Sequence, residues 1–329
     1  MPTFLTTPKM SPELTERVEA SVAGRPAGRA KMSPTVVAVL RFVGIAAVVG
    51  IVALLVVERR RAVDALEADR NALLSQLHES TAHVTAADKA LLPRIEAWVG
   101  EHSGDYEGDI VDESLRGEGM TATLARPILY LRGPIGGFKS LQGLADMGQT
   151  TFRDAFVLCL FDPPAKATEK TLREAARAVL SDGERIKVAA HVERFHTARA
   201  GLPFLMPQWE ERVRTVDDSR ALAELRNRLK RVNLEDTVRA LKARLFLVVM
   251  DEPKDGNGPT EIDGANRHYV RVVLLDLETN EVLLRQRKLV DPAWIPTNRR
   301  SEHANGINSC ELGMEVRAAM TGSVVPARQ

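Results

Sequence analysis

An apolar run from Val36 to Val57 is the feature that most constrains how this chain can fold. Arg41 is its one charged residue, and every residue from Phe42 onward is apolar or glycine. About 20 residues of this kind form a helix that spans a hydrocarbon core of about 30 Å, whereas a soluble helix needs a polar face. We therefore predict a transmembrane helix over 36–57. We expect it to be an uncleaved signal-anchor, because the polar segment before it is long and no small-x-small cleavage site follows it before the charged run Glu58-Arg59-Arg60-Arg61.

This run divides the chain into segments of different composition. Residues 1–35 are rich in proline, glycine and charge, and they are predicted to be a disordered tail. After the membrane helix, leucines recur with nearly heptad spacing and predict a helical stalk over 58–86. The stalk either forms a coiled coil or packs on the domain that follows. The remaining residues, 87–329, are enough for one soluble domain.

Basic residues flank the membrane helix almost equally on its two sides. They are Arg17, Arg25, Arg29 and Lys31 before it and Arg59, Arg60, Arg61 and Arg70 after it. Arg41 can extend toward the tail side, and large domains cross membranes with little regard to their charge. We expect an inner (plasma) membrane protein with a cytoplasmic N-terminus and an extracytoplasmic C-terminal domain, although Arg59–Arg61 favours the reverse. Small residues within the membrane helix also allow a homodimer through this helix and the stalk.

Composition excludes several classes of protein. The chain has 329 residues, 44% of them hydrophobic, and a net charge of +1, so it carries no basic field for a nucleic acid partner. Two cysteines, Cys159 and Cys310, are too few for a disulfide framework or a cysteine-based zinc site. We expect each to be a small core residue, and neither identifies the compartment.

The pattern within 87–329 predicts an α/β or α+β domain with a mixed sheet, flanking helices and a C-terminal β-hairpin. Apolar or β-branched runs predict strands at 125–132, 155–161 and 244–250 and a hairpin from 268–277 and 281–290. Residues 186–198 fit either a strand or a helix. Helical spacing predicts helices at 88–99, 168–180, 219–229, 234–243 and 309–320, and residues 100–119 and 251–266 read as loops.

A glycine-rich stretch follows the first of these strands. Residues 133–140, GPIGGFKS, resemble the phosphate-binding loop of P-loop nucleotidases, G-x-x-x-x-G-K-[ST], except that Phe138 replaces the last glycine. The resemblance implies a phosphate or anion site at Gly133, Gly136, Gly137, Lys139 and Ser140. Residues 245–252, LFLVVMDE, resemble the hydrophobic strand of these nucleotidases that ends in an acidic pair. In that family the Asp lies near magnesium and the Glu near the attacking water, and the matching residues here are Asp251 and Glu252. A nucleotide-dependent enzyme with ATP and Mg²⁺ is therefore the alternative hypothesis, although no L-S-G-G-Q motif precedes this strand.

Three other patterns lack the spacing that a metal requires. His191-Val192-Glu193 begins like a zinc-deaminase motif, but no P-C-x-x-C follows it. His191 and His196 are five residues apart, which puts them on different sides of a helix. Residues 255–258 begin like a calcium loop, but Pro259 stands at a ligand position. We predict no metal site.

A second resemblance covers residues 238–288. The stretch contains a helix, a buried strand and the two β-rich runs of the predicted hairpin, joined at Glu278-Thr279-Asn280. This order is similar to the α/β domain of envelope lipoproteins of the curli-secretion and penicillin-binding-protein-activator type. Asn280 stands where those proteins have glycine, and Asn tolerates a positive φ better than other side chains. This resemblance implies a domain without catalytic residues or cofactor that binds another envelope protein. We expect a membrane-anchored binding or regulatory module of the cell envelope rather than an enzyme.

Overall fold

The computed structural model describes residues 33–151, 154–181, 189–252 and 266–323. Contacts divide the chain into two units, Met1–Ala65 and Leu66–Gln329. The predicted tail, except for its last residues, and most of the predicted loop at 251–266 lie outside the described residues. The calcium-like stretch at 255–258 lies outside them as well.

The first unit contains the whole apolar run, 36–57. Helix α2 (Pro34–Thr81) covers all of 36–57, and among the described residues it is the one helix long and apolar enough to cross a membrane. None of its most apolar 18-residue window is buried, and Phe42 is 76% exposed. Exposed apolar side chains along a helical segment of this length are unfavourable in water and favourable in lipid. The helix is compatible with a single-pass membrane protein.

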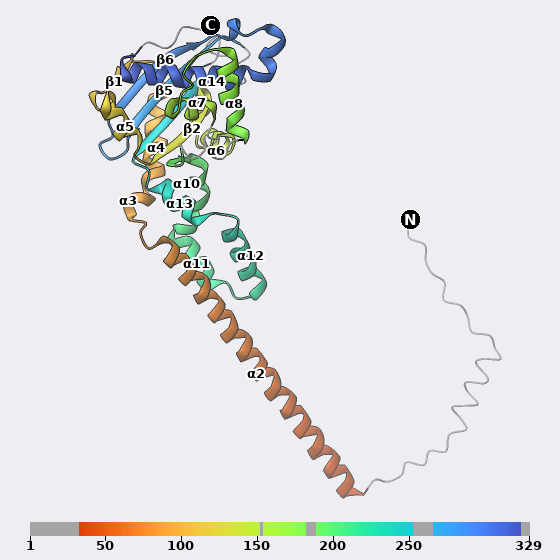
Figure 1. Ribbon diagram of the computed structural model, residues 1–329. Helices are drawn as coiled ribbons and strands as arrows, with labels where there is room; N and C mark the ends of the chain where they lie inside the picture. The colour runs from red at the N-terminus through yellow and green to blue at the C-terminus, as the bar shows by residue number, and fades with distance from the viewer. Residues whose placement is uncertain (1–32, 152–153, 182–188, 253–265, 324–329) are drawn as a thin grey trace, which may run out of the picture. The chain divides into compact units, whose positions relative to one another are not determined.

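The second unit is a mixed α/β domain built on one six-stranded sheet (Figure 1). The strand order is β1-β6-β5-β4-β2-β3. Strands β2, β3 and β4 are parallel, and β5 is antiparallel to both β4 and β6. The strands are β1 (Ile110–Val111), β2 (Ile128–Pro134), β3 (Val192–Arg194), β4 (Leu245–Asp251), β5 (His268–Asp276) and β6 (Val282–Val290).

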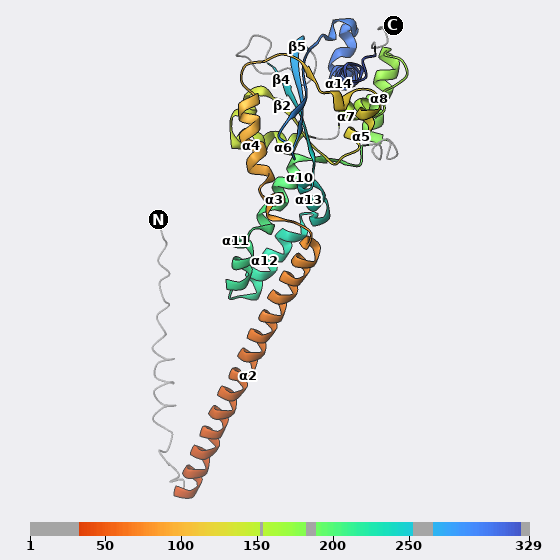
Figure 2. The same ribbon diagram turned by 90° about the vertical axis from the view of Figure 1, so that its left-hand side faces the viewer.

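Helices cover both faces of this sheet, as Figure 2 shows with the sheet nearly edge-on. One face packs on α4 (Leu91–His102), α6 (Leu141–Thr150), α10 (Phe195–Gly201) and α13 (Leu234–Leu241). The other face packs on α5 (Glu118–Leu124), α7 (Ala155–Phe161) and α14 (Thr297–Thr321), with α8 (Glu169–Ser181) outside them. Shorter elements connect these layers: α3 (Ala86–Lys89), η1 (Glu113–Leu115), η2 (Ile135–Lys139), η3 (Leu202–Leu205) and η4 (Pro292–Trp294).

The end of α2 belongs to this domain. Leu73, Leu74 and Leu77 are 2–4% exposed and lie in the same core as α11 (Pro207–Thr215) and α12 (Ser219–Lys230). Asp69 accepts a hydrogen bond from Arg226 at 3.1 Å. The compact unit thus begins at Leu66, before the boundary expected at residue 87, and these leucines are packed on the domain rather than left free for a coiled coil.

The strand predicted at 155–161 is wrong: these residues form helix α7. Asp154 caps the helix by accepting a hydrogen bond from the Val157 amide. Phe156 and Leu160 face the sheet, whereas Cys159 faces α8 and α14. Because both sides are buried, the sequence lacks the polar face that would mark a helix, and a continuous apolar run fits both structures.

The cysteines are not separate core residues but form a disulfide. Cys159 of α7 and Cys310 of α14 are bonded, with their Cα atoms 5.1 Å apart and a sequence separation of 151. Both side chains are fully buried, and the described residues include no free cysteine. The bond joins the central helix of one layer to the last helix of the chain.

Candidate functional site

The carboxyl ends of β2 and β4 lie side by side and form the edge at which ligands bind in many open α/β sheets. Gly133 pairs with Met250 and Pro134 with Asp251. The glycine-rich stretch and the acidic pair, which are separate in the sequence, therefore meet at one edge of the sheet.

The glycines of this stretch serve close packing in the structure. A Cβ on Gly133 or Gly137 would lie 2.3 Å or 2.8 Å from the sulfur of Met147 in α6. A Cβ on Gly143 would lie 2.2 Å from the Gly137 carbonyl oxygen. Ser140 caps α6 by accepting a hydrogen bond from the Gly143 amide at 3.0 Å. Because these glycines have no side chain, η2 and α6 can lie close together.

The remaining residues of the stretch differ in their exposure to solvent. Phe138, which takes the place of the family's glycine, is 1% exposed and belongs to the core. Lys139 and Gly136 are exposed. The structure thus brings Lys139 and Ser140 to the start of α6, while Gly133 and Pro134 end β2 and Ile135–Lys139 form the short 3-10 helix η2.

A buried polar network, which we call the Arg132 cluster, occupies one face of the sheet at this edge. It connects the three strands β2, β4 and β5 to helices α7 and α14. The cluster consists of Tyr130, Arg132, Asp154, Asp251, His268 and Ser309.

Arg132 is the centre of the cluster and uses all of its guanidinium nitrogens. Its Nε and Nη2 donate to the two carboxylate oxygens of Asp251 at 3.2 Å and 3.1 Å. Its Nη1 donates to Asp154 at 3.0 Å and to the Ser309 hydroxyl at 2.8 Å. Tyr130 donates to the same Asp154 oxygen at 3.1 Å. This bidentate pairing fixes Arg132 between β4 and the start of α7.

Asp251 is fully buried, and its charge depends on these partners. Burial opposes ionisation, but the charge of Arg132 and hydrogen bonds from His268 and Arg132 outweigh it and lower the pKa of Asp251. His268 is 2% exposed at its side chain, with Nε2 3.4 Å from Asp251 and Nδ1 2.8 Å from the Asn266 carbonyl. Burial opposes protonation of the ring, but these hydrogen bonds and the charge of Asp251 raise the pKa of His268.

A second network, the Glu252 cluster, lies on the opposite face and consists of Tyr106, Glu252, Tyr269, Arg271 and Arg287. Arg271 and Arg287 both donate to the Glu252 carboxylate, and the Nη2 of Arg287 is 2.5 Å from it. The Arg287 guanidinium lies 4.0 Å from the Tyr269 ring centre and 6.0 Å from that of Tyr106. Glu252 is 6% exposed, so both acids of the predicted pair are buried and bound to arginines.

The other sequence motifs are not assembled into a site. His191 is hydrogen-bonded to the Leu124 carbonyl at 2.7 Å, and Glu193 pairs with Arg239 at 2.9 Å. Within the described ranges, no three His, Cys, Asp or Glu side chains are placed to hold a metal ion.

Sequence reasoning did not find Arg132, Asp154, His268 or the arginines of the Glu252 cluster. One signal was available: Arg132 and Arg271 are charged residues next to apolar residues in largely apolar strands, and buried charges need partners. Comparisons with models of protein families, with curated protein sequences and with solved structures gave no match to this chain. We therefore infer its function from its own residues.

Proposed function

We propose that the chain is a single-pass protein of the plasma membrane whose α/β domain lies outside the cytoplasm and acts as a binding or regulatory module of the cell envelope. The apolar helix supplies the anchor, with the N-terminus in the cytoplasm. The resemblance of residues 238–288 to envelope lipoproteins supports a protein partner in the same compartment.

The observation that carries this proposal is the Cys159–Cys310 disulfide. Disulfides form and persist in oxidising compartments and are rare in the cytosol, where thiols are kept reduced. The bond crosses the core between α7 and α14 and is fully buried, so it must form as the domain folds. Its presence favours the extracytoplasmic side and outweighs the Arg59–Arg61 triplet, since large domains translocate with little regard to charge.

The pairing of the acidic residues favours binding over catalysis. A nucleotide-hydrolysing site needs an acid free to hold Mg²⁺ and a second free to orient water. Here Asp251 is held by Arg132 and Glu252 by Arg271 and Arg287. Opening such buried pairs to a metal would leave charged guanidinium groups without partners, which is costly.

Reporter fusions after Gln329 test the orientation. We expect an alkaline phosphatase fusion, which is active only outside the cytoplasm, to be active and a green fluorescent protein fusion to be dark. A fluorescent fusion with an inactive phosphatase would contradict the proposal and restore the nucleotide hypothesis.

Thermal unfolding of the full chain in detergent tests the enzymatic alternative. We expect ATP with Mg²⁺ to leave the melting temperature unchanged. A bound nucleotide at about 100 times its dissociation constant would add about 2.7 kcal/mol to the free energy of unfolding. A rise in melting temperature that Lys139→Ala abolishes, and that the control Lys170→Ala at another exposed lysine preserves, would overturn the binding-module proposal.

A further inference from the structure

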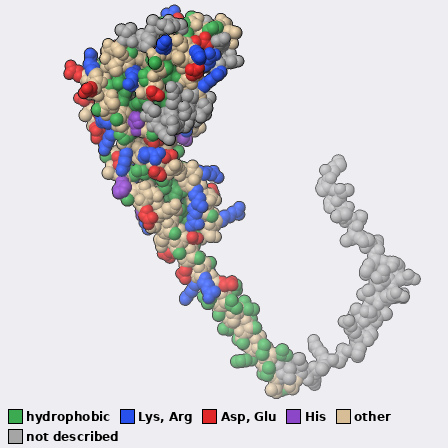
Figure 3. Space-filling view, in the orientation of Figure 1, with side chains coloured by type: hydrophobic (Ala, Val, Ile, Leu, Met, Phe, Trp, Pro, Cys, Tyr) green, Lys and Arg blue, Asp and Glu red, His purple; other side chains and the backbone are tan. Residues whose placement is uncertain are grey.

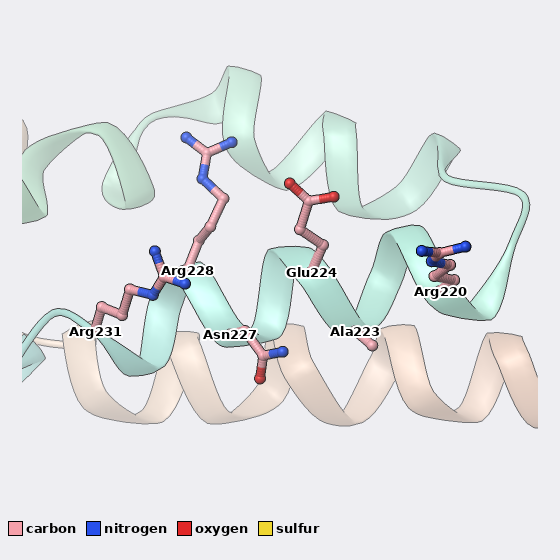
Figure 4. A pocket seen from close by; sticks show the side chains of 6 residues that line it. All are labelled: Arg220, Ala223, Glu224, Asn227, Arg228 and Arg231. Atoms are coloured by element: carbon pink, nitrogen blue, oxygen red, sulfur yellow. The ribbon is translucent and has the colours of Figure 1, made fainter.

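The outer face of α12 carries a row of basic side chains. Arg220, Arg228 and Arg231, with Ala223, Glu224 and Asn227, line a hollow of about 460 Å³. In Figure 4, Arg228 and Glu224 project from the same side of the helix, with Arg220 and Arg231 toward its two ends. Lys and Arg side chains gather over α12 in Figure 3.

These three arginines have no internal function that the structure reveals. They are exposed, and their side chains make no hydrogen bond or ion pair with any described residue. The neighbouring Arg226 and Arg214, by contrast, are paired with Asp69 and Glu210. Glu224 is the one carboxylate among the residues that line the hollow, and three arginines line it too, so the net charge of the hollow is positive. The face is complementary to an anion.

A second hollow, of about 250 Å³, lies on the other side of the same helix. Its charged lining residues are Arg226, Lys230 and Glu235, and Arg226 is paired with Asp69. Leu73 and Leu229, which also line it, are 2% and 5% exposed. The free positive charge of α12 is therefore concentrated in the first hollow.

The covalent chain limits how far α12 can lie from the membrane segment. Asp69, the partner of Arg226, follows Val57 by twelve residues. Twelve residues span at most about 43 Å when fully extended. A domain tethered this closely meets the lipid surface at a high effective concentration.

We propose that the basic face of α12 binds the anionic phospholipid headgroups of the membrane in which the chain is anchored. Arginine suits this role because its planar guanidinium binds phosphate oxygens in pairs. This inference rests on the anchor of the proposed function but not on the domain's partner or on its side of the membrane. Binding would hold the domain against the bilayer and be weakened by salt.

The test uses the full chain in nanodiscs. Ala223→Cys, in the basic hollow, gives one exposed thiol for an environment-sensitive fluorophore, because the native cysteines are bonded and buried. We expect a blue shift in nanodiscs containing phosphatidylglycerol, none in pure phosphatidylcholine, and loss of the shift in high salt. The same dye at Ala165→Cys, in an exposed loop, should not respond.

Charge removal completes the test. Arg220→Gln, Arg228→Gln and Arg231→Gln together should lower the ratio of bound to free domain by roughly 100-fold, since each basic residue near an anionic surface contributes about 5-fold. The control Arg116→Gln, Lys166→Gln and Lys170→Gln removes three exposed charges elsewhere and should change it little. Circular dichroism melts check that both variants fold.

The outcomes separate this inference from the proposed function. A chain that fails to enter nanodiscs contradicts the anchor itself. A chain that enters them but shows the same emission in both lipids, or whose shift survives loss of the three arginines, contradicts headgroup binding alone. A shift produced by a soluble acidic peptide in phosphatidylcholine, without a response to phosphatidylglycerol, would overturn it in favour of an acidic protein partner.

Discussion

Asp251 is the residue on which the Arg132 cluster most directly depends, because it accepts two of the hydrogen bonds of a buried guanidinium. Removing its charge leaves Arg132 with Asp154 as its remaining anionic partner within the cluster. We predict that Asp251→Asn lowers the free energy of unfolding by about 3–5 kcal/mol, the usual result of breaking a buried pair from one side. Asp105→Asn, at an exposed position, should change it by less than about 0.5 kcal/mol in the same urea titration. Equal effects of both changes would contradict the cluster.

His268 gives the domain a pH dependence whose sign follows from its partners. Its pKa is raised above the ordinary 6.5, so the folded state favours the protonated ring more than the unfolded state does. This contribution to stability is fully present below pH 6.5 and is lost as the pH rises through the raised pKa. We predict that unfolding free energies measured across this range fall with pH and that His268→Gln removes the fall. The exposed His83→Gln serves as the control and should leave the curve as it is.

At the same scale, the backbone of Asn280 has a φ of +61° in the turn between β5 and β6. Its position between two β-rich runs favours such a turn. Asn tolerates this conformation better than other side chains, which is why a local pattern could identify it. Arg132 could not be placed by such reasoning, since its partners lie 22, 119 and 177 residues away in the sequence.

At the scale of elements, the contact between α7 and α14 depends on a close approach of backbones. A Cβ on Gly313 would lie 2.5 Å from the Phe156 carbonyl oxygen and 2.9 Å from the Leu160 amide. We predict that Gly313→Ala forces α14 outward and lowers the unfolding free energy by about 1–3 kcal/mol. Gly100→Ala, in the exposed part of α4 with nothing within 4 Å, should instead raise it by up to about 1 kcal/mol. A neutral or stabilising Gly313→Ala would show that the helices are not packed this closely.

The elements that the sequence predicted best are those with one clear periodicity. Strands β2 and β4 overlap the apolar runs predicted at 125–132 and 244–250 and end one or two residues later, and α12 and α13 follow helical spacing. Helix α7 was missed because it is buried on both sides, and β1, η1 and α5 because they are too short to show a period within 100–124. The disulfide was missed because pairing between two positions 151 residues apart is a property of the fold.

At the scale of the whole molecule, the disulfide should also matter for stability. A crosslink over so many residues restricts the unfolded chain, and loss of a native disulfide typically lowers the free energy of unfolding by about 2–5 kcal/mol. We predict that Cys159→Ala with Cys310→Ala lowers the melting temperature of the purified chain. Adding a reductant to this double variant should cause no further change, whereas a reductant with denaturant should weaken the wild type to the same level. A variant that melts like the oxidised wild type would contradict a structural role for the bond.

The redox state of Cys159 and Cys310 in intact cells is the measurement that most directly tests a membrane anchor with an extracytoplasmic domain. Cells are quenched with acid, and the denatured proteins are alkylated with a maleimide polymer, with or without prior reduction. We predict that the chain sediments with the membranes until detergent releases it, and that it gains two polymer adducts only after reduction. A membrane-bound chain whose thiols react without reduction would contradict the side of the membrane, and a chain that stays soluble without detergent would contradict the anchor.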